Sequence, residues 1–289
     1  MLNEFPLEAC RVLVTRPAGQ QQELIAAIEA LGGEAISLPL LAVEPIRDAG
    51  AEARLREDIS RLQDYDLLIF VSVNAARFGA KQIIGRIAES GVAISPKAAI
   101  LAVGAATARE AASLLDRPVH GPATGGGSEI LLELPQLEDV KDRRVAIFRG
   151  QGGRELLAAE LRRRGAIVDY FEVYRRTPAA GAAGQLKEIL SESPPDAAVI
   201  TSAESLARWR ELLGEIAGAA KNRAIALPLK ATECAARYAD RLLAKPVVVP
   251  SRRVAELAAQ HGFTVVIDAG DAAAKAMVEA LAAHWRRES

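Results

Sequence analysis

The chain has 289 residues, of which 50% are hydrophobic and 25% charged, and its formal net charge is −1 at pH 7. This composition is typical of a globular protein, and the length indicates about two domains. A net charge so near zero argues against general binding of nucleic acid or of anionic lipid.

Neither targeting segments nor ligand patterns stand out in the sequence. The start, Met1–Pro6, lacks the basic region and apolar run of a signal peptide, and apolar runs such as Ala98–Val103 are too short to span a bilayer. Cys10 and Cys234 form no disulfide framework, and the histidines have no spacing typical of metal ligands. We therefore expect a cytoplasmic protein with no metal site and no membrane or nucleic-acid partner.

The first segments of the chain predict a strand–helix–strand unit. Residues 11–15 are nearly all apolar, which is typical of a strand buried on both faces. Gly19 and Gln20 then open a helix with apolar residues at helical spacing, and Gly32-Gly33 ends it. A second strand at 35–38 follows, and the crossover rule makes the two strands parallel.

Buried strands continue to alternate with amphipathic helices along the rest of the chain. The further predicted strands are residues 66–71, 98–103, 145–148, 197–200, 246–249 and 264–267. Helices are expected between them, among others at 51–63, 154–164 and 183–190. Alternation of this kind implies parallel sheets covered by helices on both faces. The alanine-rich segment 214–245 is expected to be helical and has no assigned role.

The strand–helix–strand unit occurs twice. A shift of 133 residues aligns Arg16 with Arg149, Leu24 with Leu157 and Pro45 with Pro178. A repeat of this length is too long for a solenoid and indicates two similar α/β domains. We expect residues 1–42 with 177–289 to form one domain and 46–173 the other. Two extended linkers, about 41–46 and 171–178, would join the domains.

Candidate site residues follow the predicted strands, since ligands of open parallel sheets bind beyond the carboxyl ends of the strands. These residues are Arg16, Ser72, Asn74, Thr107, Arg149, Ser202 and Ser251. Most of them begin a helix, and the free N–H groups of a helix N-terminus suit anions. For any single Ser, Thr or Asn, a plain helix N-cap is the favoured interpretation. Their recurrence in two similar domains favours a binding site.

Two glycine-rich loops are weaker candidates. The loop Gly150–Glu155 follows a strand, but Glu155 stands where a dinucleotide fingerprint needs its third glycine. The loop Thr124–Ser128 lacks the lysine of a phosphate loop. Each could form a backbone nest for an anion, and a simple tight turn is an equally good interpretation.

Tyr174 is the best single candidate for a catalytic group. A tyrosine hydroxyl is neutral at pH 7 and can protonate a leaving group. From position alone, an aromatic residue that packs at the linker is an equally good interpretation. The neighbouring Arg175 and Arg176 are either solvated linker charges or a source of attraction for a polyanionic ligand.

Seven short stretches share their order and spacing with a known family. They are Val14–Pro17, Phe70–Ala75, Val103–Ala108, Phe148–Gly150, Val173–Arg176, Thr201–Glu204 and Val249–Ala255. Through them the chain resembles the uroporphyrinogen-III synthase family over nearly its whole length. It departs from the family pattern at 214–245, which is long, and at Val249 or Pro250, where a glycine is usual.

The resemblance implies two flavodoxin- or Rossmann-like parallel-sheet domains joined by a two-stranded β-ladder, with the active site in the cleft. It implies that hydroxymethylbilane, a linear tetrapyrrole with eight carboxylates, is converted to uroporphyrinogen III with loss of water and inversion of ring D. No metal or organic cofactor is implied. Tyr174 is the implied acid, and main-chain amides at the strand ends are the implied carboxylate ligands. The substrate-binding residues are then expected to be Arg16, Ser72, Asn74, Thr107, Arg149, Gly150, Ser202, Ala203 and Ser251.

Other interpretations remain open at this point. The chain could be a non-catalytic two-domain anion-binding protein or a regulatory relative of the family. A nucleotide-dependent α/β enzyme is disfavoured by the broken glycine fingerprint. For a synthase we expect a monomer that could receive its substrate directly from the preceding pathway enzyme.

Overall fold

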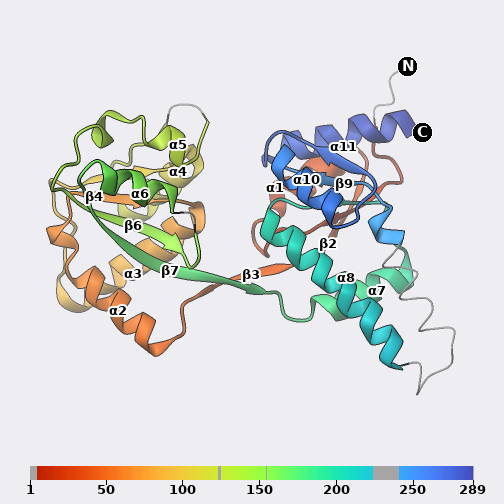
Figure 1. The fold of residues 1–289 in the computed structure, drawn as a ribbon, viewed down its shortest axis with the longest axis horizontal. Coiled ribbons are helices and arrows are strands. Elements are labelled where there is room, and N and C mark those ends of the chain that lie inside the picture. The colour runs from red at the N-terminus through yellow and green to blue at the C-terminus, as the bar shows by residue number, and fades with distance from the viewer. Residues whose placement is uncertain (1–4, 123–124, 154, 224–240, 289) are drawn as a thin grey trace. The chain divides into compact units, whose positions relative to one another are not determined.

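The computed structural model describes residues 5–122, 125–153, 155–223 and 241–288. Contacts between residues divide the chain into two units. Unit 1 consists of Met1–Ala42 with Thr177–Ser289, and unit 2 of Val43–Arg176. Each unit contains a five-stranded sheet (Figure 1). The part of the predicted helical segment that falls at 224–240 lies outside the described residues.

Unit 1 is built on the sheet β10-β9-β8-β1-β2. Its strands are β1 (Arg11–Val14), β2 (Glu34–Ser37), β8 (Ala197–Val199), β9 (Val247–Val249) and β10 (Val266–Asp268), and all four neighbouring pairs are parallel. Its helices are α1 (Gln22–Glu29), α7 (Ala182–Glu192), α8 (Ala203–Arg223), α10 (Arg252–Gln260) and α11 (Ala274–Glu288). Counted along the chain, the strand order is 2-1-3-4-5, the flavodoxin-like order.

Alternation along β1 explains the two layers of unit 1. Leu13 packs with a core cluster that includes residues of α7, α8 and α10. Val12 and Val14 pack with a second cluster that includes residues of α1 and α11. Successive side chains of a strand point to opposite faces, so a nearly continuous apolar run buries both faces of the sheet.

Unit 2 is built on the sheet β3-β7-β6-β4-β5. Its strands are β3 (Leu41–Pro45), β4 (Leu67–Phe70), β5 (Ala99–Ala102), β6 (Arg144–Gly150) and β7 (Ile167–Pro178). Its α-helices are α2 (Ala49–Ser60), α3 (Val73–Ser90), α4 (Ala105–Leu115), α5 (Ser128–Leu131) and α6 (Leu156–Arg163), with short 3₁₀ turns at Leu62–Asp64 and Pro135–Leu137. The pairs β4–β5, β4–β6 and β6–β7 are parallel.

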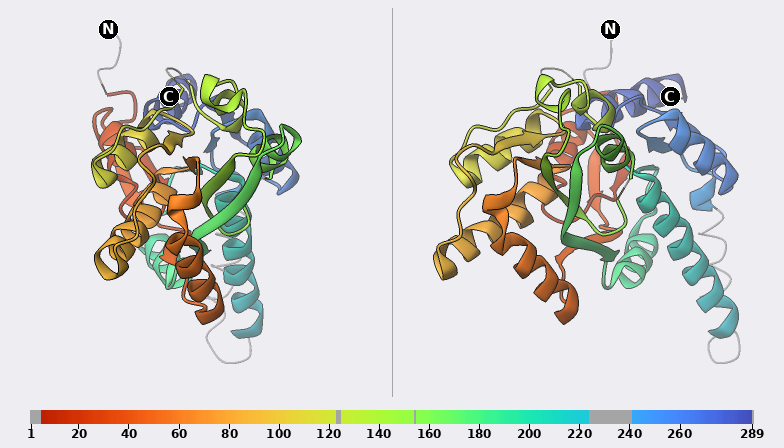
Figure 2. Two further views of the ribbon diagram at one scale, coloured as in Figure 1. Left: turned by 90° about the vertical axis from the view of Figure 1, so that its left-hand side faces the viewer. Right: turned by 60° about the vertical axis from the view of Figure 1, so that its left-hand side comes forward.

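The helices of unit 2 cover both faces of its sheet (Figure 2). On one face, residues of α2, α3 and α4 pack with Phe70, Phe148 and Phe171, and we call this group the aromatic core cluster. On the other face, α5 and α6 pack against Ile69 and Ile147. The prediction of an α/β fold with parallel sheets covered on both faces is therefore confirmed.

The strand registers confirm the internal repeat. Val12 of β1 pairs with Ala35, and Val145 of β6 pairs with Val168, so both members of the pair shift by the same 133 residues. On its other side Val12 pairs with Ala197, and Val145 pairs with Leu67. The strands β8 and β9 follow the repeat in unit 1, whereas the corresponding β4 and β5 precede it in unit 2. Four strands of each sheet therefore have the same spatial order in a permuted chain order.

Two predicted helix boundaries were wrong by a few residues. The first helix begins at Gln22 rather than at Gly19, because Gly19 takes a left-handed turn conformation with φ 76°. The helix predicted at 51–63 is Ala49–Ser60, because the Asp48 side chain accepts a hydrogen bond of 2.8 Å from the Ala51 N–H and caps it earlier. Among the described residues, no helix is long and apolar enough to cross a membrane.

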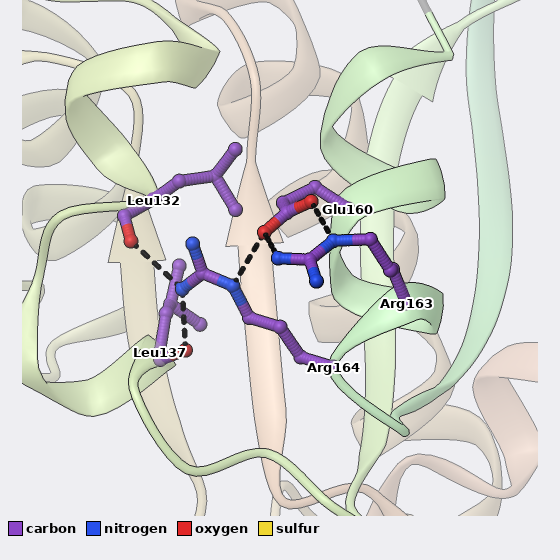
Figure 3. A network of polar contacts seen from close by, with 5 residues as sticks. All are labelled: Leu132, Leu137, Glu160, Arg163 and Arg164. Carbon is purple, nitrogen blue, oxygen red and sulfur yellow. Dashed lines mark hydrogen bonds and ion pairs between the residues drawn. The ribbon is translucent and has the colours of Figure 1, made fainter.

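A polar network fastens α6 to the segment that follows α5 (Figure 3). Nη1 of Arg164 donates to the carbonyl oxygens of Leu132 and Leu137, each at 2.9 Å. Glu160 accepts hydrogen bonds from Arg163 at 2.7 Å and from Arg164 at 2.9 Å. Glu160 therefore orients Arg164, and Arg164 in turn holds the segment that follows α5 against the end of α6.

The same network predicts a loss of stability in acid. Hydrogen bonds from Arg163 and then Arg164 lower the pKa of Glu160 from 4.5 to about 2. A lowered folded-state pKa contributes stability that is fully present above pH 4.5 and is lost as the pH falls through about 2. Glu160→Gln should therefore lower the free energy of unfolding at neutral pH, and the difference from wild type should shrink between those limits. Urea unfolding over this range measures it, and a difference that does not change with pH would contradict the assignment.

Candidate active site

A pocket of about 370 Å³ lies within unit 2, at the carboxyl ends of β4, β6 and β7. The residues used below that line it are Ser72, Arg149, Gly150, Tyr170, Tyr174 and Arg176. A hollow of about 420 Å³ over α2 and α3 is larger, but it lies away from the strand ends and opens widely to solvent. Because ligands of parallel sheets bind beyond the carboxyl ends of strands, the pocket in the sheet edge is the better candidate.

Tyr174 occupies this pocket because β7 contains a bulge. Glu172 pairs with Arg149, but the next residue of β6, Gly150, pairs with Tyr174, so Val173 is the extra residue. Val173 and Tyr174 consequently both pack with the aromatic core cluster, although strict alternation would send them to opposite faces. The Tyr174 side chain is almost fully buried.

The Tyr174 ring is held closely on two sides. A Cβ atom at Gly150 would lie 2.6 Å from two of the ring carbons, so only a glycine leaves room there. The ring of Phe78, from α3, lies 5.7 Å away between centroids. This packing fixes where the hydroxyl lies.

Within the described part of the chain, the Tyr174 hydroxyl has two polar partners. Its oxygen lies 3.2 Å from Ser72 Oγ and accepts a hydrogen bond of 3.2 Å from Nη2 of Arg176. Ser72 is the N-cap of α3, and its Oγ accepts from the Ala75 N–H at 3.0 Å. A guanidinium only donates hydrogen bonds, so the phenol proton points to Ser72 or to a ligand in the pocket. The group is thus arranged to give up a proton.

Arg149 is engaged with the loop that follows its own strand. Its guanidinium donates to Gly150 O at 3.3 Å and to Gly153 O, and it pairs with Glu155 at 3.0 Å. It also stacks on the Tyr170 ring, 4.3 Å from the centroid, and Tyr170 donates its hydroxyl proton to Glu155. Hydrogen bonds from Tyr170 and then Arg149 lower the pKa of Glu155. A direct role of Arg149 in substrate binding stays a prediction, while its contacts shape the wall of the pocket.

The other predicted residues of unit 2 lie near the same sheet edge. Asn74 is in the first turn of α3. Thr107 is also in a first turn, that of α4, where it is buried. The interpretation of Thr107 as an N-cap is wrong, because Gly104 occupies the cap position of α4. The pocket itself brings together Ser72, Arg149, Gly150 and Tyr174.

Unit 1 carries the remaining predicted residues at equivalent strand ends. Because Ala197 and Leu67 hold the same place beside the repeated strand, Ser202 corresponds to Ser72. The Oγ of Ser202 accepts from the Ser205 N–H at 3.0 Å. Ala203 begins α8, and Ser251 is the N-cap of α10 but makes no side-chain cap bond.

Arg16 follows β1 and donates through Nη2 to the Ala272 carbonyl oxygen. Burial lowers the pKa of its guanidinium. Arg16 and Arg149, which the repeat equates, therefore both bind carbonyl oxygens of their own unit.

A family model described as uroporphyrinogen-III synthase HemD matches residues 22–279. The chain belongs to the uroporphyrinogen-III synthase family. The uroporphyrinogen-III synthase of Proteus mirabilis is 34% identical over 166 residues, which cover 57% of this chain and 79% of the relative. That of Escherichia coli (strain K12) is 31% identical over 166 residues, or 57% of this chain and 64% of the relative.

Family membership agrees with the fold. The crystal structure of a mutant uroporphyrinogen III synthase from the extremely thermophilic bacterium Thermus thermophilus matches with a TM-score of 0.58 and 20% identity, covering 97% of this chain and 100% of the other. At that identity the match shows a shared α/β fold with two sheets. In the part of the chain that the structure covers, no group of three or more His, Cys, Asp or Glu side chains is placed to hold a metal ion.

Proposed function

We propose that this member of the uroporphyrinogen-III synthase family acts on hydroxymethylbilane as a cyclising hydro-lyase and produces uroporphyrinogen III. One observation carries the assignment of the site. The buried Tyr174 presents its hydroxyl to a pocket at the strand ends, with Ser72 and Arg176 as partners. A neutral phenol in this place is suited to protonate a poor leaving group.

The proposed first step is loss of the substrate hydroxyl. The Tyr174 O–H bond breaks and its proton passes to the leaving oxygen, the C–O bond breaks, and water departs. The cation left on the substrate is then attacked by the pyrrole carbon of ring D that already carries a bridging methylene, which gives a spiro intermediate. The older bond from that carbon to its methylene breaks, and the methylene cation so released bonds to the unsubstituted pyrrole carbon of ring D, so the ring is inverted as the macrocycle closes. Closure replaces a C–H bond with a C–C bond and so releases one proton, which restores the phenol.

Carboxylate binding is proposed to rest mainly on backbone amides, since the chain has a net charge of −1. In unit 2, Gly150 and the first turns of the helices that carry Ser72, Asn74 and Thr107 supply N–H groups at the sheet edge. The equivalent residues of unit 1 are Arg16, Ser202, Ala203 and Ser251. Arg149 contributes through the loop that it holds in place.

The two units are further proposed to be separate domains that two neighbouring strands connect. The chain leaves unit 1 between Ala42 and Val43, within β3, and returns between Arg176 and Thr177, within β7. These strands are neighbours in one sheet, which supports the two-stranded ladder implied by the family resemblance. The protein is further proposed to be a cytoplasmic monomer that can receive its substrate directly from the preceding pathway enzyme.

Growth of a bacterium whose own synthase gene has been deleted tests the proposed function. Expression of this chain should restore haem-dependent growth, and a catalytically impaired variant produced at the same level should restore it poorly. A chain that folds and binds tetrapyrroles but never restores growth would be the non-catalytic or regulatory relative that the sequence left open.

A further inference from the structure

We propose that Arg176 takes part in the reaction by holding the negative charge that develops on the Tyr174 oxygen when the phenol gives up its proton. This inference rests on the proposed function, in which Tyr174 is the acid, and it gives Arg176 a second role beside Tyr174 in the same proton transfer. The family resemblance assigned no role of this kind to Arg176, and the sequence could not separate it from Arg175.

The contact geometry supports this role. Nη2 of Arg176 lies 3.2 Å from the Tyr174 oxygen, and the guanidinium carbon lies 5.6 Å from the ring centroid. A guanidinium donates to a phenol oxygen in either protonation state, but with a phenolate the bond also gains the Coulomb attraction between opposite charges. Arg176 therefore stabilises the state after proton transfer more than the state before it, which is what raises kcat.

The environment of the phenol strengthens this effect. The Tyr174 side chain is 2% exposed, so water solvates a charge on its oxygen poorly. Ser72 is a neutral partner whose Oγ already accepts a hydrogen bond from the α3 backbone. Arg176 is thus the cationic group in contact with the oxygen among the described residues.

Alternation along β7 separates the two neighbouring arginines. Consecutive residues of a strand point to opposite faces, and Arg175 pairs with Glu44 of β3 at 3.4 Å. Arg176 instead lies at the pocket, where it contacts Tyr174. Arg175 is therefore a matched control, because it has the same charge and an adjacent position but a different partner.

The experiment compares steady-state kinetics of Arg176→Gln, Arg176→Lys and Arg175→Gln with hydroxymethylbilane. Loss of one charge-assisted hydrogen bond predicts that Arg176→Gln lowers kcat by about 10- to 100-fold with little change in KM. Arg176→Lys retains the charge and should recover part of that loss. Arg175→Gln should keep the wild-type kcat.

A double-mutant cycle then asks whether Arg176 acts through Tyr174. In a Tyr174→Phe background, Arg176→Gln should have no further effect on kcat, since no phenolate forms there. An additive loss, or a raised KM with wild-type kcat, would overturn the inference and make Arg176 a ligand of a substrate carboxylate. The inference would also be overturned if the wild type is active and Arg176→Gln has the same kcat. Absence of turnover by the folded wild type would instead contradict the proposed function and the inference together.

Discussion

Tyr174→Phe should lower kcat by about 10²- to 10⁴-fold, the usual contribution of a general acid. The substitution removes one oxygen and leaves the ring between Gly150 and Phe78, so the fold should persist. Loss of the hydrogen bonds to Ser72 and Arg176 should reduce stability by only about 1 kcal/mol. Initial rates at saturating hydroxymethylbilane, together with urea unfolding, measure both effects.

Tyr65→Phe is the matched control for this prediction. Tyr65 is equally buried in unit 2 and donates its hydroxyl proton to Asp169 at 2.8 Å, but it precedes β4 and so lies at the opposite end of the sheet. The Tyr65→Phe variant should be less stable than the wild type and should keep the wild-type kcat. Wild-type kcat in a folded Tyr174→Phe variant would leave Tyr174 as a packing residue.

Gly150→Ala should impair the reaction without removing a polar group. Its new Cβ atom would lie 2.6 Å from two Tyr174 ring carbons, so the ring must move. A displacement of about 1 Å at a reacting group can cost about 100-fold in rate, and overpacking typically costs about 1–3 kcal/mol of stability. We therefore expect kcat to fall by about 100-fold.

Gly85→Ala is the control for adding a methyl group in the same unit. Gly85 lies within α3, where a Cβ atom would meet nothing within 4 Å, and alanine favours a helix over glycine. It should keep kcat and gain a little stability. Equal kinetics for Gly150→Ala and Gly85→Ala would show that the Tyr174 ring position does not limit the reaction.

Much of the fold could be predicted from the sequence, because it depends on patterns along the chain. Apolar runs such as 67–70 are buried on both faces, and the helices between them have one apolar face. The repeat could be predicted because matching residues, such as Arg16 and Arg149, recur 133 positions apart in the sequence. The approximate position of the site followed from the rule on strand ends.

The details of the site depend on contacts across the sheet and were not predictable. The bulge at Val173 decides which face Tyr174 occupies, and its cause lies in pairing with β6 rather than in local sequence. The choice between Arg175 and Arg176 follows from β7 continuing as a strand to Pro178 instead of ending in an irregular linker.

Arg149 shows a second kind of limit. An arginine at a strand end suggests an anion ligand, but its guanidinium turns to the carbonyl oxygens of Gly150 and Gly153 and to Glu155. The sequence did single out Glu155, as the residue that breaks a dinucleotide fingerprint. Its pairing with Arg149 and Tyr170 could be found only from the folded loop.

The isomer of the product tests the central claim most directly. Freshly prepared hydroxymethylbilane is supplied to the protein, the product is oxidised, and the porphyrin isomers are separated and compared with a blank without protein. The predicted result is uroporphyrin III, formed faster than the substrate cyclises in the blank. Its rate of formation should rise in proportion to the protein concentration. Product in which ring D keeps its original orientation, formed at the rate of the blank, would contradict it.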